Sequence, residues 1–237
     1  MKANSVDYKE GATACEGWAA YDDSSTSKRP GVLLFPDWTG VGDYAQKRAA
    51  MLVQLGYAVF CVDVYGKGIR PSGQEACAAE MMKYLKDRPT LRARAKAGFE
   101  QLKKLPVVDS SRTAAIGYCF GGLVALELAR TGAQLTGVVG FHCNLNTPNP
   151  VDAKNIKAKI LVLNGANDPV VPDSETLAFE KEMRDAKVDW QLTRYGNTVH
   201  SYTQWFIPPG GAQAAYNEQS DKRSWIAMQD FFKEIFV

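Results

Sequence analysis

The chain has 237 residues, 46% of them hydrophobic and 23% charged, and its formal net charge is +2 at pH 7. This length and composition predict one globular domain over residues 1–237, and so small a charge argues against a nucleic-acid partner. No apolar run approaches the roughly 20 residues of a membrane span, and the polar residues 1–10 are not typical of a secretory leader. We therefore expect no membrane partner.

Cysteines are few and isolated, at positions 15, 61, 77, 119 and 143, without the paired spacing of a metal site. An odd number of scattered cysteines indicates reduced thiols, so a cytoplasmic location is expected.

Strands and helices are predicted to alternate along the chain. Strands are expected at 13–22 (an edge strand), 31–36, 57–63, 113–116, 135–141, 159–163 and 188–195, and helices at 43–55, 74–85, 91–105, 123–130, 174–185 and 212–235. Asp43 is predicted to cap the first helix, and the last helix carries one apolar face. This alternation predicts an α/β fold with a mostly parallel sheet of seven or eight strands, covered by helices on both faces.

A Gly-x-Cys-x-Gly turn, Gly117 to Gly121, lies between a predicted strand and a predicted helix. This is the pattern of the nucleophile elbow of α/β-hydrolases, with Cys119 where serine is usual. The glycines are expected because a strand that turns sharply into a helix crowds its own backbone. At the amino end of that helix, the free N–H groups and the helix dipole favour a thiolate. The alternative is that Cys119 only fills the core.

Two more chemically active residues follow later strands. Asp168 comes after the strand at 159–163, His200 follows the last strand, and such loops collect active-site residues in parallel sheets. The order nucleophile, acid, histidine is that of α/β-hydrolases. His200 would take the thiol proton from Cys119 or hold the thiolate as an ion pair, and Asp168 would orient the imidazole. Asp168 as a turn residue and His200 as an ordinary loop histidine are the alternatives.

Backbone N–H groups of Phe120 and Trp38 are the expected oxyanion donors. Trp38 either walls the pocket as well or packs on the core. The second of the two histidines, His142, either lines the pocket or is a hydrogen-bonded structural residue.

The chain resembles the dienelactone hydrolase family (carboxymethylenebutenolidase-like α/β-hydrolases). The resemblance rests on the elbow Gly-Tyr-Cys-Phe-Gly-Gly and on residues 31–42, 56–65, 112–122, 164–172 and 200–202. It implies a triad of Cys119, His200 and Asp168, hydrolysis of a small ester, lactone or thioester through a thioester acyl-enzyme, and no metal or organic cofactor. Monomer and homodimer both remain open.

Two positions depart from the family pattern. Asp37 stands where the family has a glutamate that is thought to gate the nucleophile; the alternative is that Asp37 caps the turn at 38–42. Gln204 replaces an arginine that grips the carboxylate of dienelactone, so we expect a neutral or differently charged substrate. Lys83, Arg70 and Arg92 are weaker candidates for a second clamp. The expected pocket residues are Trp38, Tyr118, Tyr202, Gln204 and Trp205.

Phe206 either joins that pocket or seals the terminal helix. Two other classes of function stay open beside the hydrolase: a non-catalytic binding or scaffold protein, and a thiol redox sensor in which Cys143 would be the resolving thiol.

Overall fold

The structure is a computed structural model that describes residues 1–237, and its chain forms two compact units, 1–116 and 117–237. The first unit contains β1 (Lys2–Glu10), β2 (Thr13–Tyr21), β3 (Arg29–Phe35), α1 (Asp43–Gln54), β4 (Ala58–Cys61), α2 (Gln74–Lys86) and α3 (Arg88–Lys104), and β5 (Val108–Tyr118) crosses the boundary. The second contains α4 (Phe120–Arg130), β6 (Gly137–Phe141), the 3₁₀ helix η1 (Pro150–Asn155), β7 (Lys159–Gly165), α5 (Asp173–Ala186), β8 (Trp190–Tyr195) and α6 (Glu218–Ile235).

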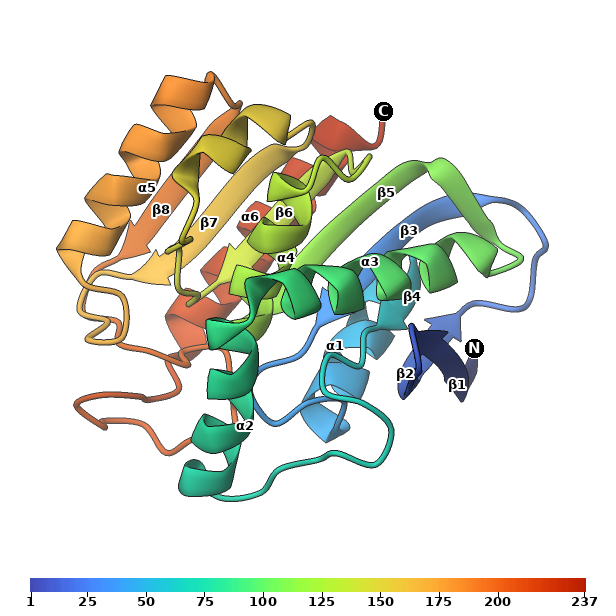
Figure 1. Cartoon of the computed structure of the whole chain (residues 1–237), viewed down its shortest axis with the longest axis horizontal. Helices are drawn as coiled ribbons and strands as arrows, with labels where there is room; N and C mark the ends of the chain where they lie inside the picture. The colour runs from blue at the N-terminus through green and yellow to red at the C-terminus, as the bar shows by residue number, and fades with distance from the viewer. The chain divides into compact units, whose positions relative to one another are not determined.

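The predicted fold class is confirmed. Eight strands form a sheet in the order β1-β2-β4-β3-β5-β6-β7-β8 (Figure 1). The pairs β3–β4, β6–β7 and β7–β8 are parallel, and only the pairs made by β2 are antiparallel among those whose register is defined.

In the first unit the expected edge strand is wrong. β1 pairs along the full length of β2 on its outer side, so β2 is an inner strand. The sequence conceals β1 because nearly all of its side chains face solvent. Tyr8 is its one buried side chain, and the Tyr8 hydroxyl donates a hydrogen bond to the carbonyl oxygen of Asp63 (3.0 Å).

Helices cover both faces of the first unit's strands. The Cys61 thiol donates to the carbonyl oxygen of Ala45 on α1, whereas the next side chain, Val62, meets Gly98 on α3. Neighbouring residues of an extended chain point to opposite faces, so α1 and α3 lie on opposite faces.

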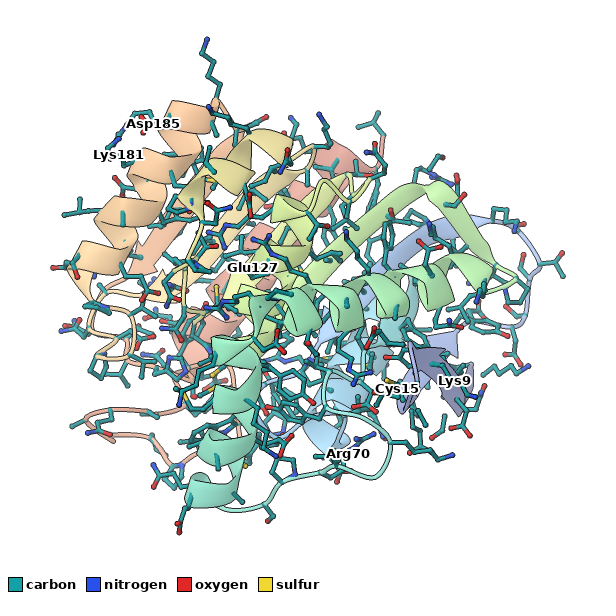
Figure 2. The ribbon with its side chains drawn as sticks, in the orientation of Figure 1. Lys9, Cys15, Arg70, Glu127, Lys181 and Asp185 are labelled. Atoms are coloured by element: carbon teal, nitrogen blue, oxygen red, sulfur yellow. The ribbon has the colours of Figure 1, made fainter.

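The second unit repeats this arrangement. A Cβ at Gly137 of β6 would meet Phe231 and Ile235 of α6, whereas one at Gly140 would meet Cys143, the residue that packs against Gly122 of α4. α4 and α6 therefore take opposite faces of β6. On α5, Lys181 and Asp185 form an ion pair on the outer side (Figure 2), while the α5 residues that are buried face inward.

Three helices have N-caps or first residues other than the predicted ones. Gly42 is the N-cap of α1 and Asp43 is its first helical residue. α3 begins at Arg88 because the Asp87 carboxylate accepts a hydrogen bond from the Thr90 N–H. α6 begins only at Glu218, where Asn217 accepts from the N–H of Ser220, so the chain from 212 to 217 is not helical. None of the helices combines the length and apolar character that crossing a bilayer requires.

Candidate active site

The chain turns sharply at Cys119, between the end of β5 and the start of α4. Cys119 has φ 54° and ψ −121°, which is sterically unfavourable for a residue with a side chain. Its N–H donates to the carbonyl oxygen of Phe141 on β6 (2.9 Å), and its own carbonyl accepts from the N–H of Gly122 (3.1 Å). Such strain persists only where the surrounding structure fixes it. Here the strained turn places the thiol of Cys119 at the amino end of α4.

Glycine is required on both sides of this turn. A Cβ at Gly117 would lie 2.1 Å from the carbonyl oxygen of Gly121, and one at Gly122 would lie 2.4 Å from the Cβ of Cys143. Both distances are far below van der Waals contact, and the first is to backbone that cannot move aside. The crowding expected at the elbow is therefore present.

Asp168 lies in the turn that follows β7. One of its carboxylate oxygens accepts the N–H of Val170 (2.8 Å), and the other is 2.8 Å from Nδ1 of His200. The side chain of Asp168 is fully enclosed, so this imidazole is its main polar neighbour besides the turn. The carboxylate fixes the orientation of the His200 ring.

His200 is buried, and its second ring nitrogen, Nε2, is 3.1 Å from Sγ of Cys119. The residue that follows, Ser201, has φ 58°. The backbone of His200 is held on both sides, because its N–H donates to Gln213 (3.2 Å) and its carbonyl accepts from Ala215 (3.1 Å). The loop 201–212 thus leaves His200 and returns to the same peptide.

The charge state of His200 follows from these neighbours. Burial alone would lower its pKa, but the negative charge of Cys119 and the hydrogen bonds to Asp168 and Cys119 outweigh burial and raise the pKa from 6.5 to about 10. The raised pKa supports a protonated His200 imidazole at neutral pH, placed between the carboxylate of Asp168 and the sulfur of Cys119. No cluster of three or more metal-ligating side chains gathers in the structure.

His142 is the polar neighbour whose role the sequence left open. Its side chain is fully buried, its Nε2 is 2.7 Å from Oγ1 of Thr203, and its ring meets that of His200 edge to face at 5.1 Å. The hydrogen-bonded interpretation is confirmed. No sequence signal pairs residues 142 and 203.

The expected pocket residues differ in exposure. Tyr118 and Tyr202 are fully buried, and the Tyr202 hydroxyl donates to the carbonyl oxygen of Leu163 (2.8 Å). Gln204 is buried, whereas Trp205 is 36% and Phe206 is 56% exposed. The alternative that Phe206 seals the terminal helix is wrong. The pocket roles themselves remain predictions.

Asp37 and Trp38 belong to the first compact unit, whereas the residues above belong to the second. One Asp37 oxygen accepts both the N–H (2.8 Å) and the hydroxyl (2.6 Å) of Thr39, which is a capped turn. The Trp38 carbonyl accepts from the hydroxyl of Tyr65 (2.9 Å). Turn capping by Asp37 is confirmed, and the gating and oxyanion roles remain predictions.

Two of the three candidates for a second clamp, Arg70 and Lys83, are occupied elsewhere. Arg70, in the loop between β4 and α2 (Figure 2), donates to the carbonyl oxygens of Val41 (3.1 Å) and Glu16 (3.0 Å). Lys83 pairs with Glu80 on the exposed side of α2. Neither is held ready for a substrate carboxylate.

The known proteins that resemble this chain include members of one hydrolase family. The profile described as "Dienelactone hydrolase family" matches residues 16–236. The crystal structure of a dienelactone hydrolase-like promiscuous phosphotriesterase from metagenomic libraries is 40% identical, with a TM-score of 0.93 over 100% of this chain and 99% of that one.

Two curated relatives are more distant. A Bradyrhizobium protein named "Probable 2-oxo-3-(5-oxofuran-2-ylidene)propanoate lactonase" is 28% identical over 81% of this chain and 82% of its own length. An uncharacterized protein of Caenorhabditis elegans is 32% identical over 62% of this chain and 95% of its own length. The resemblance inferred from the sequence is thereby confirmed: this chain belongs to the dienelactone hydrolase family and is a hydrolase of the ester and lactone class.

Proposed function

We propose that Cys119, His200 and Asp168 form a catalytic triad that hydrolyses a small ester, lactone or thioester through a thioester acyl-enzyme. The observation that carries this proposal is the unbroken hydrogen-bonded chain from the Asp168 carboxylate through both nitrogens of His200 to the sulfur of Cys119. Fold and family alone do not establish which residues react, whereas this geometry matches the roles of base, orienting acid and nucleophile.

Catalysis begins with the thiolate of Cys119 attacking the substrate carbonyl carbon. The carbonyl electron pair moves to oxygen, which the N–H groups of Phe120 and Trp38 stabilise. The tetrahedral intermediate then expels the alcohol, which takes its proton from the His200 imidazolium. A thioester on Cys119 remains.

Neutral His200 next removes a proton from water, which attacks the thioester and releases the acid and the thiolate. Asp168 stabilises the imidazolium each time it forms, which the raised pKa of His200 supports. Asp37 gates the nucleophile by its charge. Neither metal nor organic cofactor enters these steps.

The substrate is a small molecule without the carboxylate of dienelactone, since Gln204 lacks the bidentate cation of arginine. Trp38, Tyr118, Tyr202 and Trp205 supply the apolar surroundings. We also propose that residues 1–237 act as a single domain. A cytoplasmic location is proposed because all five cysteines are free thiols.

A short-chain p-nitrophenyl ester assay tests the triad. The wild type should turn over, Cys119→Ala should not, and a quenched reaction should leave the acyl mass on the peptide that contains Cys119. Cys119→Ser should fold but lose most activity, because the imidazolium is matched to a thiolate. Equal turnover by wild type and Cys119→Ala would overturn the proposal.

The same assay separates the other classes of function. Ligand binding without turnover would identify a scaffold protein, and a peroxide-dependent disulfide would identify a redox sensor. The structure disfavours the sensor, since Cys143 is fully buried and burial raises the pKa of its thiol.

A second activity, phosphotriester hydrolysis, is favoured by the 40% identity to a promiscuous phosphotriesterase over the full chain. The Cys119 thiolate would attack phosphorus and expel an aryloxide, and water would then release the phosphodiester. Paraoxon turnover that is lost in Cys119→Ala tests this activity.

A further inference from the structure

Two features of the fold hold the backbone around His142 rigidly. His142 follows the last residue of β6 and adopts φ 38°, a left-handed conformation that few non-glycine residues take. Its N–H donates to the carbonyl oxygen of Leu163 on β7 (2.9 Å). The next residue, Cys143, is gripped by the Asn164 side chain, which accepts from its N–H (2.9 Å) and donates to its carbonyl (3.0 Å). The imidazole of His142 therefore projects from a fixed base.

The ring of His142 meets the turn that carries His200 at three places. Nε2 lies 2.7 Å from Oγ1 of Thr203, the ring of Tyr202 stands edge to face at 5.3 Å, and the ring of His200 stands edge to face at 5.1 Å. The turn itself closes through the N–H of Gln204, which donates to the carbonyl oxygen of Ser201 (2.9 Å). Three parts of this turn, at residues 200, 202 and 203, therefore contact the imidazole of His142.

We propose that His142 is a positioning residue: its imidazole, oriented by the bond to Thr203, holds the His200 ring in line between Asp168 and Cys119. The inference rests on the proposed triad. The two hydrogen bonds of His200 fix its ring at Nδ1 and Nε2, but both partners lie on other loops. Nothing in those two bonds limits tilting of the ring about the line that joins them, and the edge-to-face contact with His142 does.

A loose His200 would slow proton transfer and acylation without weakening substrate binding, because His142 acts on the ring and not on the substrate. The bond to Thr203 gives the cleanest way to test this. Thr203→Val has nearly the same shape as threonine and removes only the hydroxyl, and Thr203→Ser keeps it.

Thr198→Val is the matched control. The Thr198 hydroxyl is also buried and bonds to the hydroxyl of Ser220 (2.8 Å), in the same connection that leads to His200 but away from His142. Thr198→Val also loses the bond from this hydroxyl to the carbonyl oxygen of Gly196 (3.0 Å), so it should lower stability at least as much as Thr203→Val.

The experiment measures the acylation rate of p-nitrophenyl acetate per titrated Cys119, together with KM and the urea midpoint. We expect Thr203→Val to acylate about tenfold more slowly with KM within about twofold, and Thr203→Ser and Thr198→Val to acylate at the wild-type rate. His142→Phe should match Thr203→Val, and the double variant should be no slower than His142→Phe, since both changes break one bond.

Wild-type acylation by Thr203→Val would overturn the inference, and so would an equal slowing by Thr198→Val, which would mean a general loss of stability. If His142→Phe does not fold, the three threonine variants decide. The proposed triad fails separately, by the absence of an acyl group on Cys119 in the wild type.

Discussion

Asp63 and Asp168 are buried aspartates that each follow a parallel strand of this sheet, and of these two only Asp168 belongs to the proposed active site. Asp63, after β4, accepts hydrogen bonds from the N–H groups of Glu16 (2.8 Å), Tyr65 (3.2 Å) and Gly66 (3.0 Å). Asp168, after β7, accepts one N–H and holds the imidazole of His200. Both side chains are fully enclosed.

What separates the two aspartates is the nature of their donors. Asp63 is surrounded by amides and by Arg70, none of which exchanges a proton near neutral pH, so the carboxylate fixes backbone. Asp168 faces a group that titrates and that in turn contacts the sulfur of Cys119, the proposed nucleophile. Burial and hydrogen bonding alone do not mark a site; a partner that can gain and lose a proton does.

Replacing each aspartate by asparagine should separate the two roles, and the largest effect is expected at Asp168. In Asp168→Asn the amide would donate to His200 and force the wrong tautomer, so kcat/KM for p-nitrophenyl acetate should fall by about 10³–10⁴-fold. The urea midpoint near neutral pH should fall as well, because the raised pKa of His200 depends in part on Asp168. A loss of less than tenfold would contradict the assignment of Asp168.

Asp63→Asn should lower stability and spare turnover. The amide nitrogen that replaces one carboxylate oxygen cannot accept a hydrogen bond, so some of the backbone N–H groups that Asp63 binds lose their acceptor, and Arg70 loses its buried counter-charge. The unfolding free energy should therefore fall by about 1–3 kcal/mol. Turnover per folded molecule should stay within about twofold of the wild type. Urea unfolding and burst titration measure the two quantities.

The pH dependence of stability should reveal the titrating partner that Asp168 has and Asp63 lacks. The folded pKa of His200 is raised from 6.5 to about 10, so its contribution to stability is fully present below pH 6.5 and is lost as pH rises through 10. Urea midpoints from pH 6 to pH 10.5 should fall in the wild type and in Asp63→Asn, and His200→Gln should lose this component. An unchanged pH dependence in His200→Gln would contradict the raised pKa.

The smallest expected effect concerns the support behind Asp63. Tyr8→Phe removes the hydroxyl that donates to the carbonyl of Asp63 (3.0 Å) and accepts from its N–H (3.1 Å). We expect a loss of about 1 kcal/mol in unfolding free energy and wild-type turnover. Thermal unfolding measures the loss of stability, and the ester assay measures turnover. Reduced turnover in Tyr8→Phe would contradict a purely structural role for Asp63.

The sequence predicted the parts of the fold that repeat a local pattern. Apolar runs located β3, β4 and β7, and the glycine turn located Cys119 between a strand and a helix. β1 escaped detection because pairing with β2, and not an apolar alternation, makes it a strand. α6 begins six residues later than predicted, because its N-cap is Asn217 and the chain does not become helical directly after the proline break.

The candidate site divides in the same way. The positions of Cys119, Asp168 and His200 after their strands are readable from order along the chain. The contact between His142 and Thr203 is not, because it joins residues 61 apart through two left-handed turns whose direction no residue type specifies. The residues of the proposed triad are thus predictable from local sequence, whereas the side chains that contact them are known only from the tertiary structure.

The return of the exposed 201–212 loop to the peptide of His200 has a practical consequence. Since Gln213 and Ala215 hold that peptide through backbone atoms alone, the loop tip at 205–211 can be exchanged or lengthened without altering what grips the histidine. We expect insertions at this tip, which carries the exposed Trp205 and Phe206, to change substrate preference and to leave the proposed triad in place. Such a loop is a natural place to begin engineering new ester specificities.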